Sequence, residues 1–408
     1  MLEDEQKKLN IINPIFVIIF LAISYYISPM LCILMSLLLF SRKKESRILS
    51  LFAGFSLALP ALYYVPLVTD DASRIFFVMQ GMSRIPIDGL ISWLRLWAGD
   101  YLNYPIFTGL MYIISQRYQN DLLPFIVAGI SYSLVIYVVS KFSRIFKIPQ
   151  LIKYLALFSS VLWISFLELI SGMRFTLACC VAILILLNIF IFNDFKTIKN
   201  YLSLLWFLIP LAIHPGVSLI LAPIFVILIA RQKNVVLKSS ILFIVIVGVM
   251  LLLSGYGSKF TYVEMLKNRL SIYQTTSFGY VSSLQKLIHF FVAIVTALLG
   301  TIQLHGASKN DPTNKTIFKN LFYMNFGYLL YFSVSILSLN FGMRLVAVIP
   351  IIFILSIAAD TSEYLDNREV LFNCIMLILL IIAGFIYNVS FFHINFSDIK
   401  WFFPFYNV

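Results

Sequence analysis

The stretch that decides the fold is DLLPFIVAGISYSLVIYVVS, residues 121–140, whose only charged residue is the first. A helix needs about 20 mainly apolar residues to cross the hydrocarbon core of a membrane, and this stretch supplies them without interruption. Backbone N–H and C=O groups find no water inside lipid, so a crossing segment is expected to be helical. We therefore predict a transmembrane helix at this position.

Six further stretches have the same character, and charged residues or Gly, Pro and Asn bound each of them. The whole chain of 408 residues is 61% hydrophobic and 12% charged, whereas soluble domains are about 45–50% apolar and about 25% charged. We predict an all-α polytopic membrane protein with about 11–13 transmembrane helices. No part is long or polar enough for a separate soluble domain, so residues 1–408 form a single transmembrane domain. The six stretches are 50–68, 173–192, 239–254, 287–303, 320–338 and 370–388.

Lysine and arginine residues lie mostly in short loops rather than on one face of a helix. The formal net charge of +12 therefore reflects the enrichment of basic residues on the cytoplasmic side of membrane proteins. We exclude nucleic acid as a partner for the same reason. The loops predicted to be cytoplasmic are 41–47, 141–153, 194–200, 231–238 and 306–319.

Two regions face outward in this topology, 69–120 and 255–285. Within the first, Arg84–Ala98 is amphipathic and carries two tryptophans, which predicts a helix lying in the membrane interface. Pro105–Arg117 is a second short apolar segment, expected to enter the bilayer without crossing it. The outward loops are thus expected to carry short amphipathic helices. The apolar face of the first is predicted to consist of Ile87, Leu90, Ile91, Leu94 and Trp97.

Two apolar runs contain a proline and leave the topology open. Residues 11–40 contain Pro29 and form either one kinked or tilted helix or a tight pair of helices. The choice between the two decides on which side of the membrane the N-terminus lies. Residues 201–230 are broken at His214–Pro215 and form either a short hairpin or one kinked span. The acidic start Met1–Lys8 lacks the basic region and cleavage pattern of a signal peptide, so we expect the first apolar helix to direct insertion.

Two arginines stand at predicted helix starts on the outward side. Arg174 and Arg344 each end a Gly-Met-Arg sequence that opens an apolar segment. Helix N-termini attract anions, and a guanidinium adds planar donors suited to phosphate. We predict that both arginines bind an anion. The alternative is that they reach past the apolar core to lipid headgroups.

Ionisable residues at membrane depth are costly and therefore candidates for function. His214 stands at a helix break, and broken helices line cavities; the alternative is that it caps the break. Arg74 follows an acidic pair by one helical turn, and the alternative there is an N-cap and a surface ion pair. Glu168 lies in an apolar run, where the alternative is that it partners the nearby Arg174. The acidic candidates are Asp70, Asp71, Asp100 and Glu168.

Motifs of soluble enzymes are absent from the sequence. The four histidines are scattered and have no carboxylates at ligand spacing, so we predict no metal site and no cofactor. All four cysteines fall within apolar runs, which argues against a disulfide framework.

The order and spacing of four short motifs resemble the EpsG/Wzy-type polysaccharide polymerases of bacterial surface-glycan synthesis. The resemblance extends from about residue 50 to residue 230. Relatives commonly carry Glu where this chain has Tyr104, so no role for a carboxylate is carried over to that position. The motifs are Thr69-Asp70-Asp71-Ala72-Ser73-Arg74, Tyr104-Pro105-Ile106-Phe107, Gly172-Met173-Arg174-Phe175-Thr176-Leu177-Ala178 and Ile213-His214-Pro215.

This resemblance implies an enzyme that joins oligosaccharide repeat units on undecaprenyl diphosphate at the outer face of the bacterial inner membrane. Its partners would be lipid-linked oligosaccharide, membrane lipids, and a chain-length regulator or flippase. It would be a metal-independent glycosyltransferase. Arg174, Arg344 and Arg74 are the candidates for binding the lipid diphosphate. The sugar hydroxyl that attacks needs a proton acceptor, and the candidates are Asp70, Asp71, Glu168 and His214.

Two other classes of protein are compatible with the same residues. A transporter or flippase of lipid-linked oligosaccharide would use the same cations to bind the same anion, and such proteins often contain inverted repeats. A non-catalytic scaffold of a polysaccharide synthase complex is the third class.

Overall fold

The structure is a computed structural model in which every regular element of the described residues is a helix. The all-α prediction is confirmed for this part of the chain. The described residues are 19, 21–24, 35, 47–64, 66, 71–164, 166–191, 202–217, 283–310, 315–335, 350–359 and 367–392.

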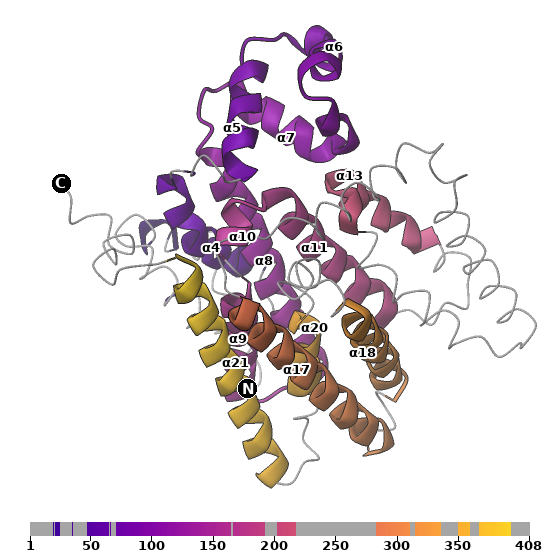
Figure 1. The fold of residues 1–408 in the computed structure, drawn as a ribbon. Coiled ribbons are helices and arrows are strands. Elements are labelled where there is room, and N and C mark those ends of the chain that lie inside the picture. The colour runs from indigo at the N-terminus through magenta and orange to yellow at the C-terminus, as the bar shows by residue number, and fades with distance from the viewer. Residues whose placement is uncertain are drawn as a thin grey trace, which may run out of the picture.

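Of the helices in the described residues, eight pack into a bundle (Figure 1). Helix α8 lies at its centre and packs against α4, α9 and α11, while α17 packs against α18 and α20, and α21 packs along α9. The eight are α4 (Arg47–Ala58), α8 (Leu122–Ile145), α9 (Gln150–Trp163), α11 (Met173–Leu186), α17 (Ser283–Asn310), α18 (Lys315–Ser335), α20 (Pro350–Ala359) and α21 (Asn367–Phe392).

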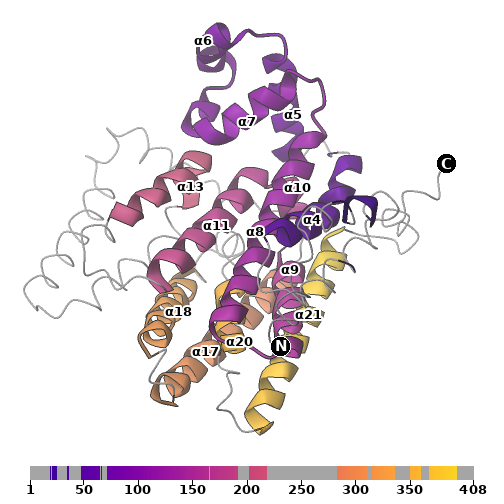
Figure 2. The ribbon, with the colours of Figure 1, turned by 180° about the vertical axis from the view of Figure 1, so that it is seen from behind.

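Three short helices form a separate layer at one end of the bundle, which we call the cap, residues 71–115 (Figures 1 and 2). They are α5 (Asp71–Met82), α6 (Ile87–Trp97) and α7 (Pro105–Ser115), and the 3₁₀ turn η2 (Gly99–Asn103) joins the last two. Below α7 lies α13 (Leu208–Ile213), which packs against both α7 and α11.

Short helical segments complete the described chain. The 3₁₀ turn η1 (Leu59–Tyr63) extends α4, and α10 (Phe166–Ile170) precedes α11. A single π-helical segment, η3 (Leu187–Ile191), ends α11. The segments η4 (Ser203–Phe207) and η5 (Pro215–Val217) flank α13.

By length and composition, α8 is the one helix of the described residues that can cross a membrane by itself. It contains the stretch 121–140. The shorter apolar helices of the described residues are 10–17 residues long, which is less than the length of about 20 residues needed to cross a membrane. The number of about 11–13 transmembrane helices therefore stays a prediction. The predicted stretch 239–254 lies outside the described residues, as do residues 255–282 of the predicted outward region 255–285 and nearly all of 11–40. Residues 283–285 begin α17.

Small residues let the backbones of bundle helices approach closely. A Cβ added to Gly54 of α4 would overlap the Ser133 hydroxyl of α8, and one added to Gly129 would lie 2.6 Å from the Phe55 ring. A Cβ on Gly384 of α21 would lie 2.8 Å from a carbonyl oxygen of α9. The Ser133 hydroxyl donates to the carbonyl of Gly129 at 2.6 Å, so this buried polar group is satisfied within its own helix. Such contacts are typical of helices that pack inside membranes.

Two sequence expectations need correction. The predicted loop 141–153 is mostly helix, because α8 continues to Ile145 and α9 begins at Gln150. Lys147, two residues beyond the end of α8, has a positive φ of 49°. The predicted loop 306–319 is likewise mostly helix, because α17 continues to Asn310 and α18 begins at Lys315. In the cap, Leu94 of α6 is 2% exposed whereas Trp97 is 77% exposed, so α6 buries only part of its apolar surface.

Candidate functional site

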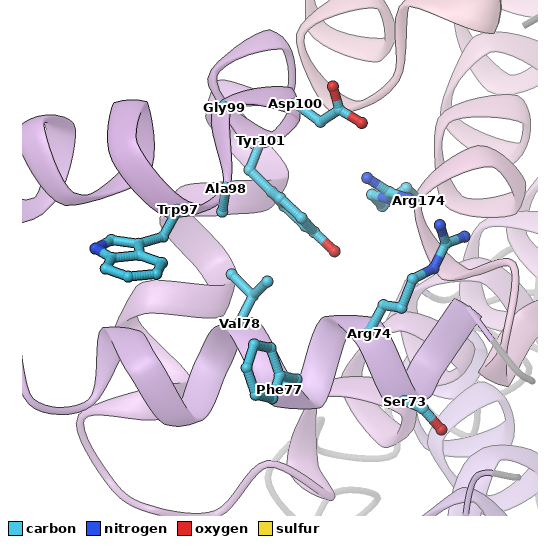
Figure 3. Close-up of a pocket in the computed structure, with 10 residues that line it drawn as sticks. All are labelled: Ser73, Arg74, Phe77, Val78, Trp97, Ala98, Gly99, Asp100, Tyr101 and Arg174. Carbon is cyan, nitrogen blue, oxygen red and sulfur yellow. The ribbon is translucent and has the colours of Figure 1, made fainter. Parts of the chain in front are cut away.

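A cavity of about 610 Å³ lies where the cap meets the start of α11. Figure 3 shows both guanidinium groups and the Tyr101 hydroxyl pointing toward one another, with Trp97 on the side away from Arg174. The lining therefore has a charged part and an aromatic part. The lining residues are Ser73, Arg74, Phe77, Val78, Trp97, Ala98, Gly99, Asp100, Tyr101 and Arg174.

Local chain geometry places Arg174 in the first turn of α11. Gly172 is the N-cap residue, and its carbonyl accepts the N–H groups of Phe175 at 3.1 Å and Thr176 at 3.2 Å. The Thr176 hydroxyl also donates to the carbonyl of Glu168 at 3.1 Å. This tight start directs the positive end of the helix dipole and the Arg174 guanidinium toward the same region.

Two tyrosines of the cap support the Arg174 guanidinium. Its Cζ lies 5.0 Å from the centre of the Tyr101 ring and 4.5 Å from that of Tyr104, and the two rings are close to perpendicular, at 82°. Thr108 fixes both tyrosine backbones, because its hydroxyl donates to the carbonyl of Tyr101 at 2.7 Å and its N–H to that of Tyr104 at 2.8 Å. A guanidinium held by its face keeps its N–H edge for an anion.

The ring of Tyr104 also stacks on His214. The two ring centres are 5.2 Å apart and the planes differ by 14°. Phe175 contacts the imidazole edge-on at 5.4 Å. The Nδ1 atom of His214 accepts a hydrogen bond from the N–H of Gly216 at 3.0 Å. A neutral imidazole that accepts through Nδ1 carries its proton on Nε2.

The cavity has two arginines in its lining and two carboxylates in or next to it. Arg74 pairs with Asp71 one helical turn away, and this carboxylate raises the pKa of the guanidinium. Burial raises the pKa of Tyr101 while Arg174 and Arg74 act in the opposite direction. The Tyr101 phenol therefore stays neutral near pH 7 and retains a proton to donate. Asp100 supplies a carboxylate among the lining residues.

The structure brings together some of the predicted residues. Arg74 and Arg174, which are separated by 100 positions, line one cavity, and Asp71 adjoins it through Arg74. His214 lies one layer behind Tyr104 and is not among the lining residues. Glu168 lies in the short helix before α11. Asp70 and Arg344 lie outside the described residues.

Sequence reasoning missed the aromatic residues that build the site. Tyr101 and Tyr104 support Arg174, while Phe77 and Trp97 line the cavity. The sequence had placed Trp97 in an amphipathic helix and Tyr104 in a short motif, but neither residue was assigned to a binding site. In the described part of the chain, no group of three or more His, Cys, Asp or Glu side chains is placed to hold a metal ion.

Fold and site together define a helical protein with a cationic and aromatic cavity between a cap and a bundle. No protein-family model, curated protein or solved structure matches this chain.

Proposed function

We propose that this chain is a membrane glycosyltransferase that polymerises surface polysaccharide from repeat units linked to undecaprenyl diphosphate. It would act at the outer face of the bacterial inner membrane. The observation that carries the proposal is that Arg74 and Arg174 line one cavity together with the aromatic residues Phe77, Trp97 and Tyr101. Two guanidinium groups suit a diphosphate, and exposed aromatic rings suit the apolar faces of sugar rings.

The direction of α8 supports placing the cap outside. Its first residue, Leu122, follows the cap, and its far end carries Lys141 and Arg144, with Lys147 just beyond. Basic residues are enriched on the cytoplasmic side of membrane proteins, so the opposite end and the cap would face outward. The apolar composition and the close packing through Gly54 and Gly129 support a bundle within the membrane.

The proposed reaction is a transfer of the growing chain from its lipid diphosphate to a sugar hydroxyl. The bond between the anomeric carbon and the phosphate oxygen breaks, and a bond from that carbon to the hydroxyl oxygen forms. The diphosphate leaves with the bonding electron pair and gains negative charge, which Arg74 and Arg174 would stabilise.

The attacking hydroxyl releases a proton in this step, and a carboxylate would accept it. Asp100 lines the cavity directly, whereas Asp71 is not among its lining residues. We therefore assign the role of proton acceptor to Asp100 in place of the residues favoured by the sequence.

The test is to incubate the purified protein with undecaprenyl-diphosphate-linked repeat units and to separate the products by size. We expect a ladder of longer glycans and a slowing of about 10- to 100-fold in Arg174→Ala, because a hydrogen bond to an ionised group is worth about 1.5–3 kcal/mol. Arg174→Lys should recover only part of the rate, since lysine lacks the planar fork.

Arg95→Ala is the matched control, because Arg95 is exposed on α6 and does not line the cavity. Movement of labelled lipid-linked units across vesicles without any lengthening would instead identify a flippase. A protein that does neither, yet is required for synthesis in cells, would be a scaffold.

A further inference from the structure

His214 is linked to the cavity through a second ring. Tyr104 is 2% exposed and touches the Arg174 guanidinium and the His214 imidazole at once, at 4.5 Å and 5.2 Å between the respective centres. The imidazole is not among the lining groups of the cavity. Tyr104 therefore offers a direct route by which His214 can act on the Arg174 guanidinium.

The imidazole itself is held from three sides. Its Nδ1 accepts the Gly216 N–H, the Phe175 ring packs edge-on against it, and Tyr104 stacks on it. A Cβ on Gly216 would lie 2.8 Å from Cε1 and 2.9 Å from Nδ1, so the imidazole occupies the space that a side chain at that position would need. His214 has extended backbone, with φ −156° and ψ 115°, at the junction of α13 and η5.

We propose that His214 is a positioning residue that orients Arg174 for anion binding through the stacked ring of Tyr104. An arginine side chain loses much rotamer freedom when it binds, and fixing its orientation beforehand improves affinity. The helix break at His214–Pro215 thereby supports the anion site without touching the ligand. This inference rests on the proposed function, because it concerns the same site.

Two substitutions separate the ring of His214 from its hydrogen bond. His214→Phe keeps an aromatic ring against Tyr104 but removes the acceptor for Gly216. His214→Asn keeps an acceptor near Nδ1 but removes the ring. The measurement is calorimetric binding of inorganic pyrophosphate, and of farnesyl diphosphate as a short lipid diphosphate, to the full chain in detergent.

We expect His214→Phe to bind both probes within about twofold of wild type. His214→Asn should bind about 3- to 30-fold more weakly, the range expected for loss of an oriented cation–π contact. Gly216→Ala gives a second test, because it leaves the side chains of Arg174, Tyr104 and His214 chemically unchanged. Its Cβ would displace the imidazole, and we expect weakening in the same range.

The outcomes distinguish this inference from the proposed function. If Arg174→Ala leaves pyrophosphate binding unchanged, the anion site itself is wrong. If Arg174→Ala weakens binding while His214→Asn and Gly216→Ala do not, only the positioning role is wrong. If both His214 variants bind the probes normally but no longer polymerise, His214 is a catalytic residue. If His214→Asn binds normally and His214→Phe does not, the effect of His214 comes from its hydrogen bond with Gly216.

Discussion

The cap and the bundle use apolar residues in opposite ways. In the bundle, α20 buries all of its side chains from Ile351 to Ala359. In the cap, α6 buries only Leu94 and leaves Trp97 exposed, and Phe77 of α5 is 77% exposed as well. A helix that is apolar all round belongs in an interior or a membrane, whereas exposed aromatic side chains beside a cavity are available to a ligand.

The two regions also differ in how their elements are joined. Bundle helices approach backbone to backbone at Gly54 and Gly384, and the Phe55 ring packs directly on Gly129, so a larger side chain at any of the three would collide with its neighbour. The cap is held to the bundle through long side chains, because Arg174 of α11 rests on Tyr101 and Tyr104. The candidate site therefore lies at the boundary where a rigid bundle presents a cation to a layer of aromatic side chains.

Overpacking the α4–α8 contact should break the bundle and gives the largest expected effect. A Cβ on Gly129 would already lie 2.6 Å from the Phe55 ring, and overpacking of this kind costs about 1–3 kcal/mol or more. We expect Gly129→Leu to lose most of its monodisperse protein in size-exclusion chromatography. Gly109→Ala in the cap is the control, since a Cβ there meets nothing within 4 Å. Equal yields would show that the two regions tolerate bulk alike.

Cysteine labelling tests whether the two regions lie on different sides of a membrane. Positive-inside topology places residue 103 outside and residue 44 in the cytoplasm. In a variant without native cysteines, a membrane-impermeant maleimide added to intact cells should modify Asn103→Cys and spare Lys44→Cys. Both should react after permeabilisation. The reverse pattern would place the candidate cavity on the cytoplasmic side and exclude the proposed function.

Removing the Tyr101 hydroxyl tests whether the cap contributes a hydrogen-bond donor to the cavity. Tyr101→Phe keeps the ring under Arg174 and removes only the donor, so we expect polymerisation to slow by about 10-fold. Tyr112→Phe is the matched control, because that hydroxyl donates to the carbonyl of Ile85 at 3.1 Å and does not line the cavity. Similar losses in the two variants would assign the effect to cap stability.

The difference in polymerisation rate between wild type and Tyr101→Phe should depend on pH in one direction only. Burial raises the pKa of Tyr101 above its ordinary value of 10.0, so the phenol remains protonated through neutral and mildly alkaline pH. The advantage of Tyr over Phe should therefore be constant from about pH 6 to pH 9. It should disappear only as the pH rises through the raised pKa, as rate profiles of the two proteins would show.

The ion pair at the surface of the cap should matter least. Arg74 and Asp71 are one turn apart, and the arginine is well exposed; exposed pairs contribute about 0.2–1 kcal/mol. We expect Asp71→Asn to change the polymerisation rate by about twofold at most and the melting temperature hardly at all. A loss as large as that of Arg174→Ala would instead make Asp71 the proton acceptor in place of Asp100.

Local features of this protein followed from the sequence alone. Apolar runs predicted α8 and α11, a Gly-Met-Arg sequence placed Arg174 in a first helical turn, and His214–Pro215 marked a helix break that the structure also shows. Each depends on neighbouring residues, because hydrophobic runs, caps and prolines act over a few positions.

The composition of the site was decided only by the tertiary structure. Arg74, Tyr101, Tyr104, Arg174 and His214 come from five different elements or junctions, and their meeting depends on how the cap packs over α11 and α13. No periodicity encodes that packing, since it depends on contacts such as that of Tyr104 with His214, 110 positions apart. The sequence therefore identified the two arginines and His214 as candidates, and the fold alone showed that Tyr101 and Tyr104 support Arg174 and that His214 stacks on Tyr104.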